Sequence, residues 1–263
     1  MLKRKTISRR SPLAASLVML GALLVTGGGY VAASTAAEST ATSTAADQAT
    51  IDTGHKLFLA NCASCHGKNA EGTAAAPTLI GVGAAAVDFQ VSTGRMPAQA
   101  SGPQISDKAP QFTDQDIAAM AAYVASLAPG PAIPSDSYLA QKGNLTHGGE
   151  LFRINCAMCH NATGAGGALT GGKWAPSLKD TSPKEFYEAM VTGPQNMPVF
   201  SNSDLSPADK LDIITYLQYV QNNPSVGGDS LGDLGPVAEG LFVWVIVLGA
   251  IVGITIWLGA KSN

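Results

Sequence analysis

Cys62-Ala63-Ser64-Cys65-His66 and Cys156-Ala157-Met158-Cys159-His160 are two copies of one pentapeptide, Cys-x-x-Cys-His. This pattern is the attachment motif of c-type haem. The two thiols lie on one face of a short helix, where both can form thioethers with the haem vinyl groups. The histidine that follows is then placed as the proximal iron ligand. The motifs use all four cysteines, which leaves none for a disulfide or a thiol nucleophile. Two covalently bound haem c groups are therefore predicted.

The chain around the two motifs is also alike, which indicates an internal duplication. When the first cysteines of the motifs are aligned, similar residues follow one another in the same order in both halves. The matched positions are Leu57-Phe58 and Leu151-Phe152, Asn61 and Asn155, Pro77 and Pro176, Thr93-Gly94 and Thr192-Gly193, Met96-Pro97 and Met197-Pro198, Phe112-Thr113 and Leu205-Ser206, and Tyr123 and Tyr216. We expect two small tandem domains rather than one large domain.

A methionine follows each motif at an equivalent place, just before the last helix of each half. Met96 follows the first motif and Met197 the second, with a somewhat longer Gly/Ala-rich loop between motif and methionine in the second half. A methionine in an irregular loop ordinarily fills a core, but two Met-Pro pairs at matching positions are better explained by iron ligation. Proline fixes φ and stiffens the loop that aims the sulfur. We predict both methionines as sixth ligands, opposite the motif histidines.

Histidine and methionine together fill the coordination sphere of the iron and raise its reduction potential. No position then remains for oxygen or peroxide, so the chemistry predicted is one-electron transfer, and no catalytic residue is assigned. The two other histidines, His55 and His147, do not match each other and are predicted as surface or capping residues. Met120 and Met190 are predicted as core residues.

Four further residues are expected to contact the histidine ligands or the haem. Pro77 and Pro176 are predicted to place a backbone carbonyl against the ring N–H of the proximal histidine, a contact that orients a metal ligand. Arg95 and Trp174 are candidates for contact with the haem propionates. An exposed arginine and a packed tryptophan are the alternatives for these two residues.

Two apolar stretches flank the duplicated region. Residues 1–33 begin with a basic segment and continue as an apolar run, which indicates either a cleaved export signal or a retained membrane anchor. Residues 237–260 contain an uncharged apolar run from Leu241 to Ala260, which is long enough to predict a transmembrane helix. Basic flanks place the haem domains outside the cytoplasm and, if the first segment is retained, both termini inside it.

The remaining segments are assigned as domains and linkers. Residues 34–50 are rich in Ala, Ser and Thr and are predicted as a flexible linker. The domains are expected at 51–130 and 146–223, with linkers at 131–145 and 224–236. The predicted fold class is therefore mainly α, with two tandem domains, a C-terminal transmembrane helix and an N-terminal signal or anchor helix.

Composition restricts the possible partners. Hydrophobic residues make up 46% and charged residues 13% of the chain, which indicates membrane segments and contact with membrane lipid. Between residues 34 and 235 there are 10 Lys+Arg and 18 Asp+Glu, a difference of −8. Such an acidic body argues against a nucleic-acid partner.

Each half resembles a class I cytochrome c domain, with helix, Cys-x-x-Cys-His, loop, proline, Met-Pro and final helix in that order. The whole layout is similar to the dihaem cytochrome c subunit of actinobacterial cytochrome bcc complexes. The resemblance implies a subunit of a menaquinol:cytochrome c oxidoreductase that is itself an electron carrier. It would relay electrons from a Rieske iron–sulfur protein to a haem–copper oxidase. The implied partners are cytochrome b, the Rieske protein and oxidase subunits, in a dimeric supercomplex.

Three other interpretations stay open. A dihaem subunit of a cbb3-type oxidase would do similar work, but its anchor resembles an N-terminal one. A cytochrome subunit of a membrane dehydrogenase would co-purify with a flavin or quinone-cofactor subunit. A dihaem peroxidase would need one haem with an accessible sixth position, whereas both halves carry Met-Pro.

Overall fold

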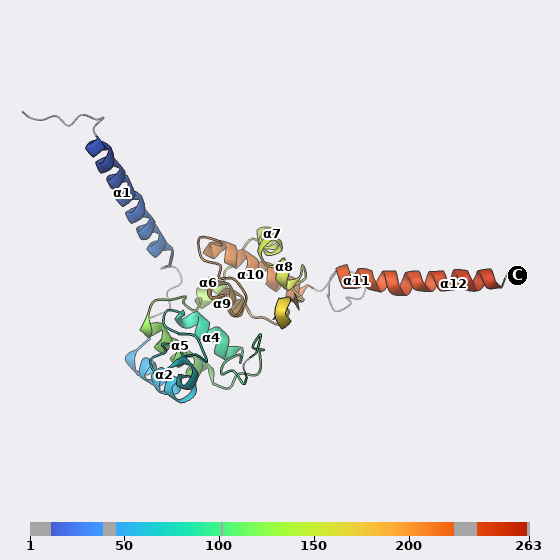
Figure 1. The fold of residues 1–263 in the computed structure, drawn as a ribbon, viewed down its shortest axis with the longest axis horizontal. Helices are drawn as coiled ribbons and strands as arrows, with labels where there is room; N and C mark the ends of the chain where they lie inside the picture. The colour runs from blue at the N-terminus through green and yellow to red at the C-terminus, as the bar shows by residue number, and fades with distance from the viewer. Residues whose placement is uncertain (1–11, 39–45, 101, 224–235, 262–263) are drawn as a thin grey trace, which may run out of the picture. The chain divides into compact units, whose positions relative to one another are not determined.

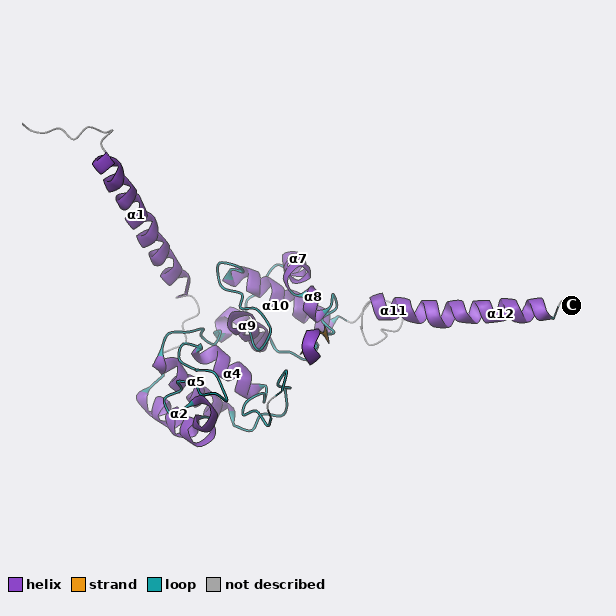
Figure 2. Cartoon of the chain, viewed as in Figure 1, coloured by secondary structure: helices purple, strands orange, loops and turns teal. Residues whose placement is uncertain are grey.

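The computed structural model describes residues 12–38, 46–100, 102–223 and 236–261. Most of this chain is helical (Figure 2), which confirms the predicted mainly α fold. Within the described ranges the strands are one short antiparallel pair, β1 (Gly167–Ala168) and β2 (Trp174–Ala175).

The N-terminal helix α1 (Pro12–Glu38) forms a unit of its own. The linker predicted at 34–50 is in part wrong, because α1 continues to Glu38 and the next helix, α2 (Gln48–Asn61), begins before residue 51. Asp47 caps α2 by accepting a hydrogen bond from the Thr50 N–H at 2.7 Å, the preferred role of aspartate at this position. Residues 39–45 lie outside the described chain.

The first domain contains α2, α3 (Ala63–His66), α4 (Gly83–Ser92) and α5 (Asp114–Leu127), drawn in blue to green in Figure 1. Helices α2 and α5 pack together closely at Gly54. A Cβ at this position would lie 1.9 Å from the Ala119 carbonyl oxygen, so only glycine allows this approach. One turn later Phe58 is buried against Tyr123, with ring centroids 5.2 Å apart.

The second domain repeats this crossing with α7 (Leu145–Asn155) and α10 (Pro207–Asn222). A Cβ at Gly148 would lie 1.9 Å from the Asp212 carbonyl oxygen. Phe152 packs against Tyr216, with ring centroids 5.5 Å apart. Gly54 and Gly148 stand at the same distance in sequence before the first cysteine of their motifs. The duplication thus includes the close contact between a glycine of the first helix and a backbone carbonyl of the second helix in each pair.

Four more elements complete the second domain: α6 (Asp136–Leu139), α8 (Ala157–His160), the 3₁₀ turn η2 (Thr170–Gly172) and α9 (Pro183–Thr192). Helix α6 falls in the segment predicted as a linker, 131–145. Its Tyr138 packs edge-on against Tyr187 at 5.3 Å, and the Tyr138 hydroxyl donates to the Pro207 carbonyl at 2.5 Å. The linker assignment is in part wrong, because this segment is packed into the second domain.

The two domains contact each other through α4 and α9. Lys184 Nζ of α9 lies 2.7 Å from Asp88 Oδ2 of α4. Glu188, one turn further along α9, is fully buried. Burial, reinforced by the nearby Asp88, raises the pKa of Glu188 to about 9, so its carboxyl group is protonated at neutral pH. A neutral acid avoids the cost of burying a second negative charge beside Asp88.

The C-terminal segment is a continuous helix built from α11 (Pro236–Phe242), the π-helical η3 (Val243–Leu248) and α12 (Gly249–Ala260). Glu239–Ala260 spans 22 residues with a mean hydropathy of 2.6. This stretch is long and apolar enough to cross a bilayer, which confirms the predicted C-terminal helix. Of the predicted linker at 224–236, residues 224–235 lie outside the described chain.

Candidate haem-binding sites

The motif of the first domain is held by a short helix, and its histidine is tied to a proline carbonyl. His66 is buried, and its Nδ1 lies 2.8 Å from the Pro77 carbonyl oxygen. A carbonyl can only accept a hydrogen bond, so Nδ1 donates a proton to Pro77. Nε2 is then the ring nitrogen that can serve as a metal ligand. The predicted contact of Pro77 is confirmed.

The second domain repeats this arrangement. His160 Nδ1 lies 3.0 Å from the Pro176 carbonyl oxygen, which confirms the matching prediction. Burial lowers the pKa of His160, against a smaller opposing effect of the Pro176 carbonyl. The imidazole is therefore neutral and its Nε2 is free to coordinate iron.

In the described part of the chain no disulfide joins the motif cysteines. Burial raises the pKa of Cys156 to about 12 and also raises that of Cys62. Both thiols are protonated at neutral pH, which argues against a reactive thiolate.

The two predicted methionine ligands lie beside their motifs. Met96 is partly buried against a cluster that also includes Cys62. Met197 is partly buried against the core of the second domain, together with Cys156. Each methionine therefore lies in the same cluster as the first cysteine of its motif. The fold brings the residues together, and iron ligation stays a prediction.

A cavity of about 950 Å³ lies at the second motif, and Cys156, Cys159, His160 and Met197 all line it. This volume is at the upper end of the range for small-molecule and cofactor sites. Apolar side chains form much of the remaining wall, namely Phe152, Leu178, Phe186, Met190, Ile213 and Leu217. Two thiols, a neutral imidazole and a thioether around an apolar space are the groups that haem c requires.

Residues of the first domain also line this cavity: Phe89, Thr93, Arg95, Gln104, Asp107 and Lys108. Arg95 and Trp174, the two candidates for propionate contact, therefore face the same space. Arg95 belongs to the first domain by sequence but lines the cavity of the second. Sequence reasoning did not anticipate a cavity wall that is supplied by the other domain.

Of the residues predicted without a role at the iron, Met158 and Met190 nevertheless line the cavity of the second domain. Met120 and Met190 are buried core residues, as expected. Met158, between the cysteines of the second motif, is 92% exposed. His55 is exposed and stacks on Tyr123 with ring centroids 4.7 Å apart.

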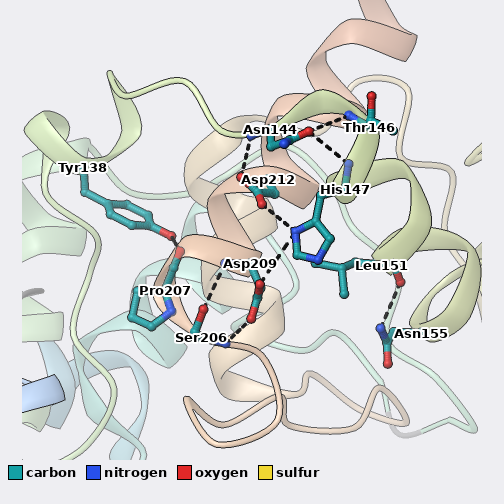
Figure 3. A network of polar contacts seen from close by, with 10 residues as sticks. All are labelled: Tyr138, Asn144, Thr146, His147, Leu151, Asn155, Ser206, Pro207, Asp209 and Asp212. Carbon is teal, nitrogen blue, oxygen red and sulfur yellow. Dashed lines mark hydrogen bonds and ion pairs between the residues drawn. The ribbon is translucent and has the colours of Figure 1, made fainter.

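His147 belongs to a network at the start of α7 (Figure 3). Asn144 Oδ1 accepts hydrogen bonds from the Thr146 and His147 N–H groups, both at 3.1 Å. His147 Nδ1 lies 2.8 Å from Asp212 Oδ2 and 3.9 Å from Asp209 Oδ1. The hydrogen bond with Asp212 raises the pKa of His147. This network ties α7 to α10 and confirms the predicted surface position of His147, whereas the residue that caps α7 is Asn144.

Lys210 is a buried residue that sequence reasoning missed. Its Nζ donates to the Ser201 carbonyl at 3.3 Å, to Asn202 Oδ1 at 3.1 Å and to the Leu205 carbonyl. Burial lowers the pKa of Lys210 to about 8. The ammonium group holds the loop that follows Met197-Pro198. A signal existed, because residue 210 precedes Ile213, Ile214 and Leu217 at the helical spacing of a buried stripe.

Two helical domains, each with a Cys-x-x-Cys-His helix and a methionine packed beside it, define a c-type cytochrome. The family model of cytochrome c matches residues 51–128. The model described as cytochrome c oxidase, cbb3-type, subunit III matches residues 143–217. These cytochrome c domains imply covalently bound haem c.

Relatives among curated proteins identify the family. The cytochrome bc1 complex cytochrome c subunit of Corynebacterium efficiens is 45% identical over 232 residues, which cover 82% of this chain and 78% of that protein. The subunit of the same name from Mycobacterium bovis is 44% identical over 266 residues, 98% of this chain and 94% of that protein. The chain belongs to the family of cytochrome bc1 complex cytochrome c subunits.

A more distant relative covers half of the chain. The cbb3-type cytochrome c oxidase subunit FixP of Sinorhizobium medicae is 30% identical over 142 residues, which cover 51% of this chain and 45% of that protein.

Proposed function

We propose that the chain is the membrane-anchored dihaem electron carrier of a respiratory quinol:cytochrome c reductase. It receives electrons from a Rieske iron–sulfur protein and relays them through two His/Met c-type haems to a terminal haem–copper oxidase. The observation that carries the proposal is the cavity of about 950 Å³ on which Cys156, Cys159, His160 and Met197 converge.

Covalently bound haem c supplies one-electron transfer. The protein's own groups would hold the cofactor: two cysteines per domain would attach it, and His66 and His160 donate their Nδ1 protons to proline carbonyls. Met96 and Met197 are assigned as the sixth ligands. Histidine and thioether ligands would fill the coordination sphere and favour a high reduction potential, as an electron carrier requires.

The C-terminal helix is assigned as the membrane anchor, with the haem domains on the extracytoplasmic side. The family name supports a place in a bc1 complex, with cytochrome b and the Rieske protein as partners. An attached carrier delivers electrons at a high effective concentration without diffusing away. Oxidase subunits and a dimeric supercomplex complete the proposed assembly.

Axial ligation is tested by replacing each predicted methionine ligand with histidine in the full chain. Met96→His and Met197→His should each retain two covalent haems by mass and lower one of two potentials by at least about 59 mV, a tenfold change for one electron. Gln115→His is the control, because it adds a histidine at an exposed position of α5 that does not line the cavity. It should leave both potentials unchanged. Unchanged potentials in both ligand variants would refute the assignment, and turnover of peroxide would favour a peroxidase.

The place in the complex is tested by purification in a mild detergent with identification of the subunits by mass. Recovery of cytochrome b and a Rieske protein with the chain supports the proposal. Recovery of oxidase subunits in the same particle supports the relay. A chain recovered alone, or with a flavin or quinone-cofactor subunit, would overturn it.

A subunit of a cbb3-type oxidase is the second candidate, because a family model of that name matches residues 143–217. Its named relative covers 51% of the chain, whereas the bc1 relative from Mycobacterium bovis covers 98%. Purification with an oxidase catalytic subunit but without cytochrome b would favour this candidate.

A further inference from the structure

A segment of the first domain, residues 104–108, joins two parts of the second domain that are far apart in sequence. Gln104 Nε2 donates to the Trp174 carbonyl at 2.7 Å, and the Trp174 N–H donates to Gln104 Oε1 at 2.8 Å. The Ile105 N–H donates to Gln195 Oε1 at 2.9 Å, and Gln195 Nε2 donates to the Ile105 carbonyl at 2.7 Å. Each side-chain amide thus pairs with both the backbone N–H and the backbone carbonyl of one residue.

The two parts held in this way carry the groups around the second iron site. Trp174 stands two residues before Pro176, whose carbonyl holds the proton of His160. Gln195 stands two residues before Met197. A single segment therefore fixes the distance between the chain that orients the histidine and the chain that presents the methionine.

The same segment is tied back to the first iron site. The Lys108 N–H donates to the Thr93 carbonyl at 3.2 Å. Lys108 Nζ donates to the Pro97 carbonyl at 2.6 Å, and Pro97 follows Met96 directly. Residues 104–108 thus connect the methionine loop of the first domain with both ligand-bearing parts of the second.

Arg95 brings a positive charge to the cavity of the second domain. Its guanidinium lies 5.0 Å from the centroid of the Phe89 ring and is half-buried. In the described part of the chain it forms no direct hydrogen bond or ion pair, although Asp107 and Glu185 are near enough to act on its charge. Asp107 and Glu185 also line the cavity and compensate part of this charge, and an anion in the space that Arg95 faces would compensate it by a direct contact. The propionate carboxylates of haem c are such anions.

We propose that the first domain forms part of the second haem site, where Arg95 binds the haem carboxylates and Gln104 positions the parts that carry Pro176 and Met197. The inference rests on the proposed function, because it requires haem c attached at Cys156 and Cys159. Arg95 touches the cofactor, whereas Gln104 acts through the groups that surround it.

The role of Arg95 is tested by redox titration of the full-length, haem-loaded protein followed by optical absorption. The Met197→His variant first identifies which of the two potentials belongs to the second domain. Arg95→Gln should then lower that potential, because a nearby cation stabilises the reduced and less positive iron site. We expect a threefold to tenfold fall in the reduced/oxidised ratio at fixed potential, where tenfold is about 59 mV for one electron. The potential of the first domain should change less than that of the second, although Arg95 directly precedes Met96.

Lys56→Gln is the charge-matched control, because Lys56 is an exposed cation of the first domain. This variant also removes one positive charge, but at a residue that does not line the cavity, and it should leave both reduction potentials unchanged. The inference is overturned if Arg95→Gln shifts only the first potential, shifts neither, or shifts no more than Lys56→Gln. If Met197→His shifts no potential, the ligand assignment itself is wrong, so the two failures are distinguishable.

The role of Gln104 is tested by the stability of methionine ligation in the oxidised protein, read from the long-wavelength absorption band of Met-ligated haem. Gln104→Ala should lower the temperature at which the band of the second domain is lost. Gln104→Glu keeps the acceptor for the Trp174 N–H and should give partial rescue. Gln115→Ala is the control, because Gln115 is an exposed glutamine of α5.

Hydrogen exchange in the same variants separates positioning from a general loss of structure. Gln104→Ala should accelerate exchange in peptides that contain Trp174 and Gln195 and leave α7 and α10 protected. An unchanged band together with unchanged exchange would overturn the positioning role. Loss of protection throughout the second domain, without rescue in Gln104→Glu, would also overturn it, because Gln104 would then support the whole fold.

Discussion

Replacing Gly148 by alanine should force helices α7 and α10 apart. A Cβ at residue 148 would lie 1.9 Å from the Asp212 carbonyl oxygen, whereas ordinary contact begins near 3.4 Å. The obstacle is backbone and cannot rotate away, so α7 must shift until that contact opens to an ordinary distance. That displacement would loosen the core in which Phe152 packs with Ile213 and Ile214.

The expected loss can be estimated from two opposing effects. Overpacking costs about 1–3 kcal/mol, and this case belongs at the upper end because a carbonyl group cannot yield. Alanine stabilises a helix interior by about 1 kcal/mol relative to glycine. The free energy of unfolding should therefore fall by about 2 kcal/mol, roughly a thirtyfold change in the folded/unfolded ratio.

Hydrogen exchange followed by mass spectrometry is the suitable assay, because a two-domain chain does not unfold in one step. Peptides from α7 and α10 should exchange roughly thirtyfold faster in Gly148→Ala, while α2 and α5 of the first domain serve as an internal reference. Gly149→Ala is the matched control, since its Cβ would lie 3.1 Å from a ring carbon of Tyr216, a side chain that can shift. Wild-type exchange in Gly148→Ala, or a larger effect in Gly149→Ala, would refute the argument.

Three other substitutions have defined outcomes. Glu188→Gln should keep the domain interface but make its stability less dependent on pH. The carboxyl group of Glu188 lies beside Asp88 and has a pKa of about 9. Its protonated form therefore contributes stability that is full below about pH 4.5 and is lost as the pH rises toward 9, at up to about 1.4 kcal/mol per pH unit. Hydrogen exchange of peptides from α4 and α9 at several pH values, referenced to α2, measures this, and the same pH dependence of protection in both proteins would contradict it. His147→Gln should destabilise α7 only at low pH, because Asp212 raises the pKa of His147 above its ordinary value of 6.5 and the contribution is lost as the pH rises through the raised pKa. Thermal melts of wild type and variant should converge in alkali, and a gap that persists there would argue against this. Lys210→Met should leave buried oxygens of the loop after the second Met-Pro pair without a hydrogen-bond donor, which destabilises the fold by about 1–3 kcal/mol for each oxygen. Unchanged hydrogen exchange in residues 199–205 would contradict the role of the ammonium group.

The attachment motifs, the duplication and the apolar C-terminal helix could be predicted because each is written in a local pattern. Helix α4 was not predicted, since its sequence is rich in alanine and lacks a clear apolar stripe. Helix α9 had a usable signal: Ser182 and Glu185 form a capping box, with Pro183 at the first helical position. The glycines at the helix crossings were not predicted, and their one sequence signal is that both lie at the same distance from their motifs.

In the candidate sites, too, contacts set by a local pattern could be predicted and contacts between the domains could not. The proline carbonyls on His66 and His160 were predictable, because the duplication places equivalent prolines after each motif. The wall formed by Arg95 and Gln104 was not, because it depends on docking of one domain against the other. Gln104 bonds a residue 70 positions away in sequence, and no periodicity or motif encodes such a pairing.

The segment that reaches across the domains also makes the two halves unequal. The stretch from the methionine to the start of the last helical motif runs from Met96 to Phe112 in the first half, and the matching stretch of the second half, from Met197 to Leu205, is shorter. The extra length in the first half includes residues 104–108. A chain in which the two halves were exchanged would keep every haem motif and every capping residue. The long segment would then belong to the C-terminal half and not to the half that precedes its binding partner. The order of the two halves therefore matters to the fold as well as their contents, because the first half supplies the connecting segment and the second half binds it.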